Sequence, residues 1–155
     1  MRALPLAFLL ASTGTAGERC TSEQTPHIHI GAQTFQASVA DTPSARQHGL
    51  SGRRELAKNS GMWFEFPTSD WHSFWMQGMH FPIDLIWVSP TQQVLGVLTL
   101  QPCTAQPCPI FVPPGPVAHV LEINANAFAG RVGDPVTWNC TPENAAGAPT
   151  ERQQR

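Results

Sequence analysis

The stretch IDLIWVSPTQQVLGVLTL, residues 83–100, carries the clearest fold signal in the sequence. Two apolar runs rich in Ile, Leu and Val, residues 83–88 and 94–100, flank a short connection that contains Ser, Pro, Thr and Gln. Short apolar runs between turn-forming residues are typical of β-strands, and successive strands joined by a short loop usually pair with each other. We therefore predict that these two runs are paired antiparallel strands.

The same pattern continues along the chain, whose 15 prolines and 12 glycines separate short apolar segments. Additional strands are predicted at residues 27–30, 33–40, 62–66, 73–77, 110–112, 117–124 and 136–139. Many short strands with little helix indicate a mainly β fold. We predict an antiparallel sandwich or open barrel with one or two short helices.

A single segment has convincing helix signals. Asp41 or Thr42 can act as the N-cap, Pro43 suits the first turn, and Gly49 is a stop signal. These signals predict a short helix that ends at Gly49, and residues 50–56 are compatible with a second short turn.

The two ends of the chain have the composition of segments outside the fold. Residues 1–17 begin with one positive residue, continue with a short apolar run and end in small residues, which is the order of a secretory signal peptide. Residues 141–155 contain no large apolar side chain and are predicted to be a disordered tail. Residues 25–140 remain as a single β-rich domain.

The four cysteines fit an exported protein. An even number of cysteines behind an export signal predicts two disulfides, of which three pairings are possible. The simplest pairing joins the two cysteines that are close in sequence, Cys103 and Cys108, and the two that flank the predicted domain, Cys20 and Cys140. A four-cysteine metal site is disfavoured because the spacing lacks C-x2-C pairs.

Composition also bounds the location and the partners. After signal cleavage no second apolar segment is long enough to span a bilayer, so we predict a soluble periplasmic or secreted protein that does not insert into the membrane. The net charge is −2, and Lys and Arg form no run. Nucleic acid is therefore not an expected partner.

Five ordered motifs resemble one known family. They are RQHGL (46–50), GMWFEF (61–66), FWM (74–76) with PID (82–84), VLE (120–122) and GDPV (133–136). In this order they resemble the family called domain of unknown function 192 (uncharacterised ACR). The resemblance covers about residues 25–140 and implies a mostly β, sandwich-type fold without an established activity. Two departures are Gly78-Met79, where the family pattern has Asn-Thr, and Ser51, where it has Met.

The residues around the third motif are the best candidates for a binding site. Asp84 lies on an apolar strand, and a buried carboxylate needs a partner. That partner is either a set of loop amides or Arg46, or a ligand held against the Trp75 indole. We predict a module that binds a small molecule or an envelope protein, without a cofactor. Its candidate binding residues are Trp75, Asp84, Arg46, Glu122 and Met76.

Two alternatives use the same region. Asp84 and Glu122 are candidates for the two carboxylates of a small periplasmic hydrolase, provided that both face one cleft. A copper-binding accessory protein would use soft ligands, for which the candidates are His72, Met76, Met79 and His80. We expect Met76 to be buried with Phe74 beneath the helix and Met79 to face the opposite way, so no metal site is predicted.

Overall fold

The computed structural model describes residues 18–143. Its elements in chain order are β1 (Gln24–Ile30), β2 (Gln33–Ala40), α1 (Pro43–His48), β3 (Ser60–Asp70), β4 (Phe74–Trp75), β5 (Ile83–Val88), β6 (Val94–Leu100), β7 (Ile110–Phe111), β8 (Val117–Asn124) and β9 (Val136–Pro142). The predicted signal peptide and most of the predicted tail lie outside the described residues. The last strand ends two residues beyond the predicted domain boundary at 140.

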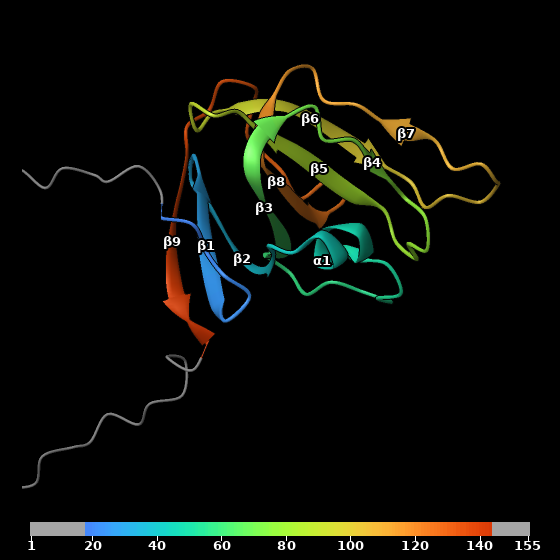
Figure 1. The fold of residues 1–155 in the computed structure, drawn as a ribbon, viewed down its shortest axis with the longest axis horizontal. Helices are drawn as coiled ribbons and strands as arrows, with labels where there is room; N and C mark the ends of the chain where they lie inside the picture. Colours follow the sequence, from blue (N-terminus) through green and yellow to red (C-terminus); the bar gives the residue numbers. More distant parts are fainter. Residues whose placement is uncertain (1–17, 144–155) are drawn as a thin grey trace, which may run out of the picture.

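The main sheet contains seven strands in the order β6-β5-β8-β3-β2-β1-β9 (Figure 1). Within residues 18–143 its neighbours are antiparallel except β2 and β3, which are parallel. This pair is the one difference from the predicted antiparallel sheet, and it arises because the chain crosses over between the two strands and forms α1 on the way. β4 and β7 form a separate two-stranded sheet.

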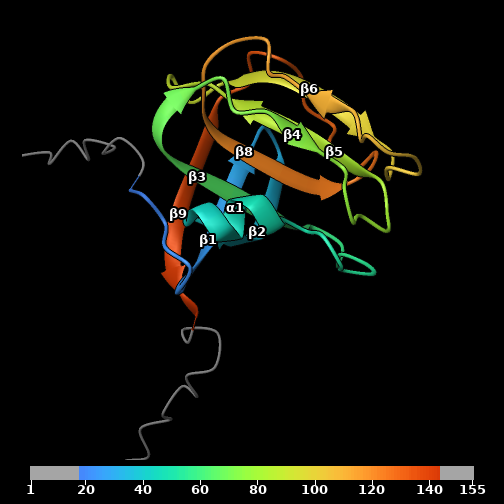
Figure 2. The same ribbon diagram turned by 45° about the vertical axis from the view of Figure 1, so that its right-hand side comes forward.

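The main sheet is strongly curved but not closed. Figures 1 and 2 show β1, β2 and β9 turned across the direction of β5 and β6. The two edges of the sheet meet at one end, where an isolated bridge joins Gln93 to Pro135. There the Val94 amide donates to the Asp134 carbonyl at 2.9 Å and the Val136 amide donates to the Gln92 carbonyl at 2.8 Å. The prediction of a mainly β fold with a short helix is confirmed.

Two apolar cores lie on the two faces of this sheet. The core inside the curl contains Ile28, Ile30, Phe35, Trp63, Ile86, Leu121 and Ile123. The core on the outer face lies beside α1 and the small sheet and contains Leu50, Met62, Phe64, Met76, Leu85, Trp87 and Val120. β3, β5 and β8 contribute side chains to both cores, because successive residues of a strand point to opposite faces.

The helix forms where the sequence predicts it. The Thr42 side chain accepts a hydrogen bond from the Ala45 amide at 3.1 Å, and the Gly49 amide closes the helix by donating to the Ala45 carbonyl at 2.8 Å. α1 has no buried residue. Arg46 ties it to the sheet instead, since one guanidinium nitrogen donates to the carbonyls of Asp41 at 2.7 Å and Glu65 at 2.8 Å.

Both predicted disulfides are present, Cys20–Cys140 and Cys103–Cys108. The first joins the residues before β1 to β9, and the second closes a short loop before β7. Two disulfides indicate an oxidising environment. Among residues 18–143, no helix is long and apolar enough to cross a membrane.

Candidate functional site

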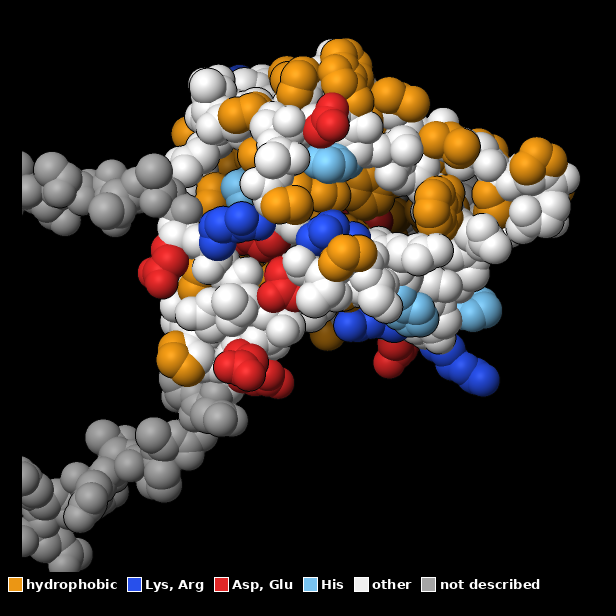
Figure 3. All heavy atoms as spheres, in the orientation of Figure 1, with side chains coloured by type: hydrophobic (Ala, Val, Ile, Leu, Met, Phe, Trp, Pro, Cys, Tyr) orange, Lys and Arg blue, Asp and Glu red, His pale blue; other side chains and the backbone are white. Residues whose placement is uncertain are grey.

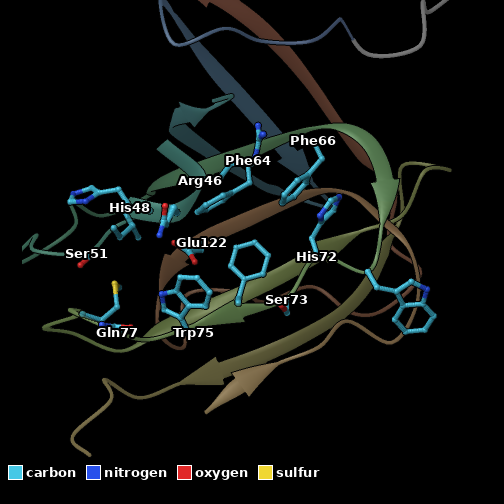
Figure 4. Close-up of a pocket in the computed structure, with 16 residues that line it drawn as sticks. Arg46, His48, Ser51, Phe64, Phe66, His72, Ser73, Trp75, Gln77 and Glu122 are labelled. Carbon is cyan, nitrogen blue, oxygen red and sulfur yellow. The ribbon is translucent and has the colours of Figure 1, made fainter. Parts of the chain in front are cut away.

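A cavity of about 340 Å³ opens between α1 and β4 (Figure 4). Its walls come from α1 and the loop that follows it, from the outer face of β3, and from the segment that contains β4, with a side chain of β8 at one wall. In Figure 3 the molecule is hollowed at this place, and hydrophobic side chains lie inside the hollow.

Aromatic rings form much of this cavity. Phe64 and Phe66 project from the outer face of β3, and Phe74 of β4 meets both of them edge to face, with ring centroids 5.1 Å and 6.4 Å apart. The His72 ring stacks on Phe66 at 3.7 Å. Trp75 lies at the opening and is 41% exposed. Edge-to-face and stacked pairs hold rings in fixed positions, so the apolar wall is preformed.

Glu122 is the buried polar group of the cavity. It lies on β8 between Met62 of β3 and Leu85 of β5, and it is only 6% exposed. In the described part of the chain, no hydrogen-bond donor or cation contacts its carboxyl group. Burial raises the pKa of Glu122 to about 8. Figure 4 shows Glu122 directed into the space between Phe64 and Trp75, with His48 pointing away.

A glycine brings the end of α1 close to this carboxyl group. Gly49 has a φ of 52°, a conformation that side chains with a Cβ rarely adopt. A Cβ at this position would lie 3.4 Å from the Phe64 ring and 3.9 Å from a Glu122 carboxylate oxygen. The Gly49 of the RQHGL motif therefore sets the spacing between the helix end and the floor of the cavity.

The two departures from the family pattern meet at the rim of the same cavity. Gly78 has a φ of 72°, and a Cβ added to it would overlap the Ser51 hydroxyl. The Gly78 carbonyl accepts a hydrogen bond from the Gly52 amide at 2.9 Å. The loop after α1 and the loop after β4 are in contact because both positions have small residues.

Three of the five predicted binding residues line the cavity, namely Trp75, Arg46 and Glu122. Arg46 lies with its guanidinium carbon 5.5 Å from the centre of the Phe66 ring. The structure thus joins two motifs that are far apart in sequence, RQHGL and VLE, at one site.

Asp84 does not line this cavity, so the structure does not place it beside Trp75 as predicted. It is 2% exposed and lies on the face of β5 that is opposite to the cavity. One carboxylate oxygen accepts from the Thr99 hydroxyl at 2.7 Å and the other from the Phe128 amide at 3.0 Å. The structural interpretation is therefore correct: Asp84 holds a loop through its amide, although its partner is not Arg46.

The hydrolase and copper alternatives gain no support from this geometry. Asp84 and Glu122 lie on opposite faces of the sheet and do not face one cleft. Met76 is buried as predicted, but Met79 lies in the same core cluster, contrary to the expectation that it faces the other way. Met76 lines a second cavity of about 470 Å³ beside the Cys103–Cys108 loop, and His80 is exposed.

A second buried glutamate lies on the inner face of the sheet. Glu65 is 1% exposed and accepts hydrogen bonds from the Trp63 indole at 3.0 Å and the Cys20 amide at 3.1 Å. Its other oxygen lies 3.0 Å from His119, whose ring stacks on Trp63 at 4.8 Å. Burial is the largest single influence and raises the pKa of Glu65, but the interactions with His119, Cys20 and Trp63 together lower it below the usual value.

Neither Glu65 nor the phenylalanines of the aromatic wall are among the binding residues predicted from the sequence. The alternation in GMWFEF contained a usable signal, since its even positions, Met62, Phe64 and Phe66, share one face. The pattern does not identify the partners of that face, because the packing of α1 and β4 against β3 is set by the path of the connecting loops and not by alternation within the strand.

The order of these motifs along the fold agrees with a profile of one protein family, described as uncharacterized ACR, over residues 26–138. The chain belongs to the DUF192 family. A search of curated proteins found no significant match. Membership in DUF192 confirms the resemblance seen in the sequence and gives no activity.

Two solved structures share the fold of this DUF192 chain. A candidate transcription regulator from Sinorhizobium meliloti 1021 has a TM-score of 0.66 and 24% identity, and the match covers 79% of this chain and 98% of that one. A protein of unknown function from Novosphingobium aromaticivorans DSM 12444 has a TM-score of 0.66 and 28% identity, with 79% and 91% covered. Both likenesses concern the fold.

Proposed function

We propose that this DUF192 protein is an exported binding module that holds a small organic molecule in the cavity between α1 and β4. The carrying observation is Glu122, a carboxyl group that is buried at the cavity and has no partner in residues 18–143. Leaving a buried polar group unpaired costs about 1–3 kcal/mol. A ligand that supplies the missing partner removes this cost, so the cavity favours occupation.

The shape and lining of the cavity support the same function. Small-molecule sites are concave, largely apolar, and contain a few polar groups that orient the ligand. Here Phe64, Phe66 and Phe74 supply apolar surface, Trp75 supplies a flat ring at the opening, and Glu122 supplies the polar anchor. Among residues 18–143, one carboxyl group lines the cavity, whereas glycoside-type hydrolysis requires two that face each other.

Export is part of this proposal. The two disulfides fit an oxidising compartment, and the composition of residues 1–17 fits a signal peptide. A binding module of this kind would meet its ligand in the periplasm or outside the cell.

Fragment screening by NMR tests the proposed function. Amide and indole signals of the oxidised protein are recorded with and without each member of a small fragment library. We expect shifts that cluster at Gly49, Phe64 and the Trp75 indole. Trp75→Ala should weaken the binding of such a fragment at least fivefold. Val132→Ala, at a residue that is 63% exposed and does not line the cavity, should leave the affinity unchanged. Absence of fragment binding, or shifts confined to the Cys103–Cys108 loop, would contradict the proposal.

A further inference from the structure

Resting on the proposed function, we infer that the ligand is an organic cation, an ammonium compound that sets its charge against Glu122 and its carbon substituents against the surrounding aromatic rings. The chemical class follows from three features of the cavity. They are a buried carboxyl group without a partner, aromatic rings beside it, and basic side chains that bond to backbone carbonyls instead of to this carboxyl group.

The first feature is the missing positive charge. The other buried carboxyl groups of the sheet, Asp84 and Glu65, each receive hydrogen bonds from N–H or O–H donors. Glu122 receives none within residues 18–143, although it is also buried, at 6% exposed. An anionic ligand would be repelled by the ionised form of this group. A cationic ligand would complete the pair that the protein leaves incomplete.

The second feature is the aromatic lining. The faces of Phe and Trp rings attract cations, and groups of such rings around a small cavity are the usual way to hold quaternary ammonium compounds. Phe64, Phe74 and Trp75 line the cavity together with Glu122. Figure 4 shows Glu122 directed into the space between Phe64 and Trp75. A further ring of the cavity, Phe66, already lies against a cation, since the Arg46 guanidinium carbon is 5.5 Å from the centre of that ring.

The third feature is the position of the other charged or titratable groups. Apart from Glu122, the groups that line the cavity are Arg46 and His48 of α1 and His72 before β4. Arg46 donates to the carbonyls of Asp41 and Glu65, and His72 bonds to the Thr68 carbonyl at 3.1 Å. In the described part of the chain, no Lys, Arg or His nitrogen lies within salt-bridge distance of Glu122.

Cation binding at this site releases a proton. Because burial raises the pKa of Glu122 to about 8, the free protein carries the neutral acid at pH 7. Pairing with a cation requires the carboxylate, so the carboxyl proton passes to solvent as the ion pair forms. The affinity for a cation of fixed charge should therefore increase about tenfold per pH unit below pH 8, or about 50-fold between pH 6 and pH 8.

The experiment compares choline with 3,3-dimethyl-1-butanol, which has the same shape with carbon in place of the charged nitrogen. Both are titrated calorimetrically into the oxidised protein at pH 6 and pH 8. We expect choline to bind about 50-fold more tightly at pH 8 than at pH 6, with proton release, and at least tenfold more tightly than the alcohol at pH 8. Glu122→Gln should abolish both differences. Glu55→Gln, at an exposed loop position, is the matched control and should change neither.

The outcomes separate this inference from the proposed function. Equal affinity for choline and the alcohol, or choline affinity that is independent of pH and of Glu122→Gln, would overturn the inference while the fragment data still support a binding cavity. Absence of choline binding at both pH values would also overturn it. If fragments fail to bind at the cavity as well, both proposals fall. Thermal unfolding of Glu122→Gln with a midpoint at or above that of the parent protein shows that the variant is folded.

Discussion

Glu65 and Glu122 are two glutamates of one sheet, both almost fully enclosed, on opposite faces. The pKa of Glu65 lies below its usual value, and the pKa of Glu122 is raised to about 8. Burial acts in the same direction on both. The difference comes from partners, because Glu65 has Trp63, His119 and the Cys20 amide, whereas Glu122 has none among residues 18–143. Enclosure alone therefore does not determine the charge of a buried acid.

The surroundings of the two groups differ in the same way. The inner face is sealed over Glu65 by Cys20, which the Cys20–Cys140 disulfide holds in place. On the outer face, Glu122 borders the cavity between α1 and β4, and α1 has no buried residue. The inner face thus satisfies its buried glutamate with protein partners, whereas the outer face leaves Glu122 accessible through a cavity.

The largest expected effect concerns the disulfide of the sealed face. Cys20 and Cys140 are separated by 120 residues and Cys103 and Cys108 by 5. In the chain-entropy description, removing the first should cost about 5 kcal/mol and removing the second about 2 kcal/mol. Urea unfolding of the two double Cys→Ser variants measures the difference. Equal losses would show that the long loop is not what makes the first bridge stabilising.

The second prediction replaces each glutamate by leucine. Glu65→Leu leaves His119 and the Trp63 indole without their acceptor and should lower the free energy of unfolding by about 4 kcal/mol at pH 7. Glu122→Leu removes an unpaired polar group from apolar surroundings and should raise it by about 2 kcal/mol. Chemical unfolding measures both values. Destabilisation of similar size in the two variants would contradict the division between the faces.

The third prediction is a pH dependence of opposite sign. Glu122 binds its proton more tightly in the folded chain, with a pKa of about 8 against 4.5, so the free energy of unfolding falls as pH rises between these values. The fall should be about 3 kcal/mol from pH 4.5 to pH 7, and Glu122→Gln should remove it. Glu65, with its lowered pKa, contributes stability above pH 4.5 that is lost as pH falls through its folded pKa, and Glu65→Gln should remove that loss. Unfolding midpoints recorded from pH 3 to pH 9 test both signs.

The smallest predicted effect concerns the rim of the cavity. Gly78 and Gly31 both have positive φ, but a Cβ at Gly78 meets Ser51 while one at Gly31 meets nothing within 4 Å. Gly31→Ala should cost about 1 kcal/mol from backbone strain alone, and Gly78→Ala slightly more. In the double variant Gly78→Ala/Ser51→Ala, the cost should return to that of Gly31→Ala. A double-mutant cycle without coupling would show that the two loops do not constrain each other.

The local parts of the fold were predictable from sequence. The predicted strands at 83–88, 94–100 and 117–124 coincide with β5, β6 and β8, and the cap at Thr42 and stop at Gly49 define α1. These features depend on neighbours in sequence. The parallel pairing of β2 with β3 depends on which strands meet after the crossover, and no local pattern encodes that choice.

The site was predictable only in part, for a related reason. Every residue of β5 is buried, so alternation along it does not tell which face opens to a cavity. Asp84 and Glu122 were therefore indistinguishable as pocket carboxyl groups in the sequence. The structure distinguishes them, because the Phe128 amide of a loop donates a hydrogen bond to Asp84 and satisfies that carboxylate.

The crossover that carries α1 also has a consequence for motion. A helix without buried residues detaches from its sheet at a lower free energy than the strands beneath it separate. We expect the amides of α1 to exchange hydrogen with solvent through local opening, and those of β5 and β8 only through global unfolding. A molecule bound between α1 and β4 would lose one wall of its cavity each time α1 opens. Its residence time would then depend on this local opening and not on the global stability of the sheet.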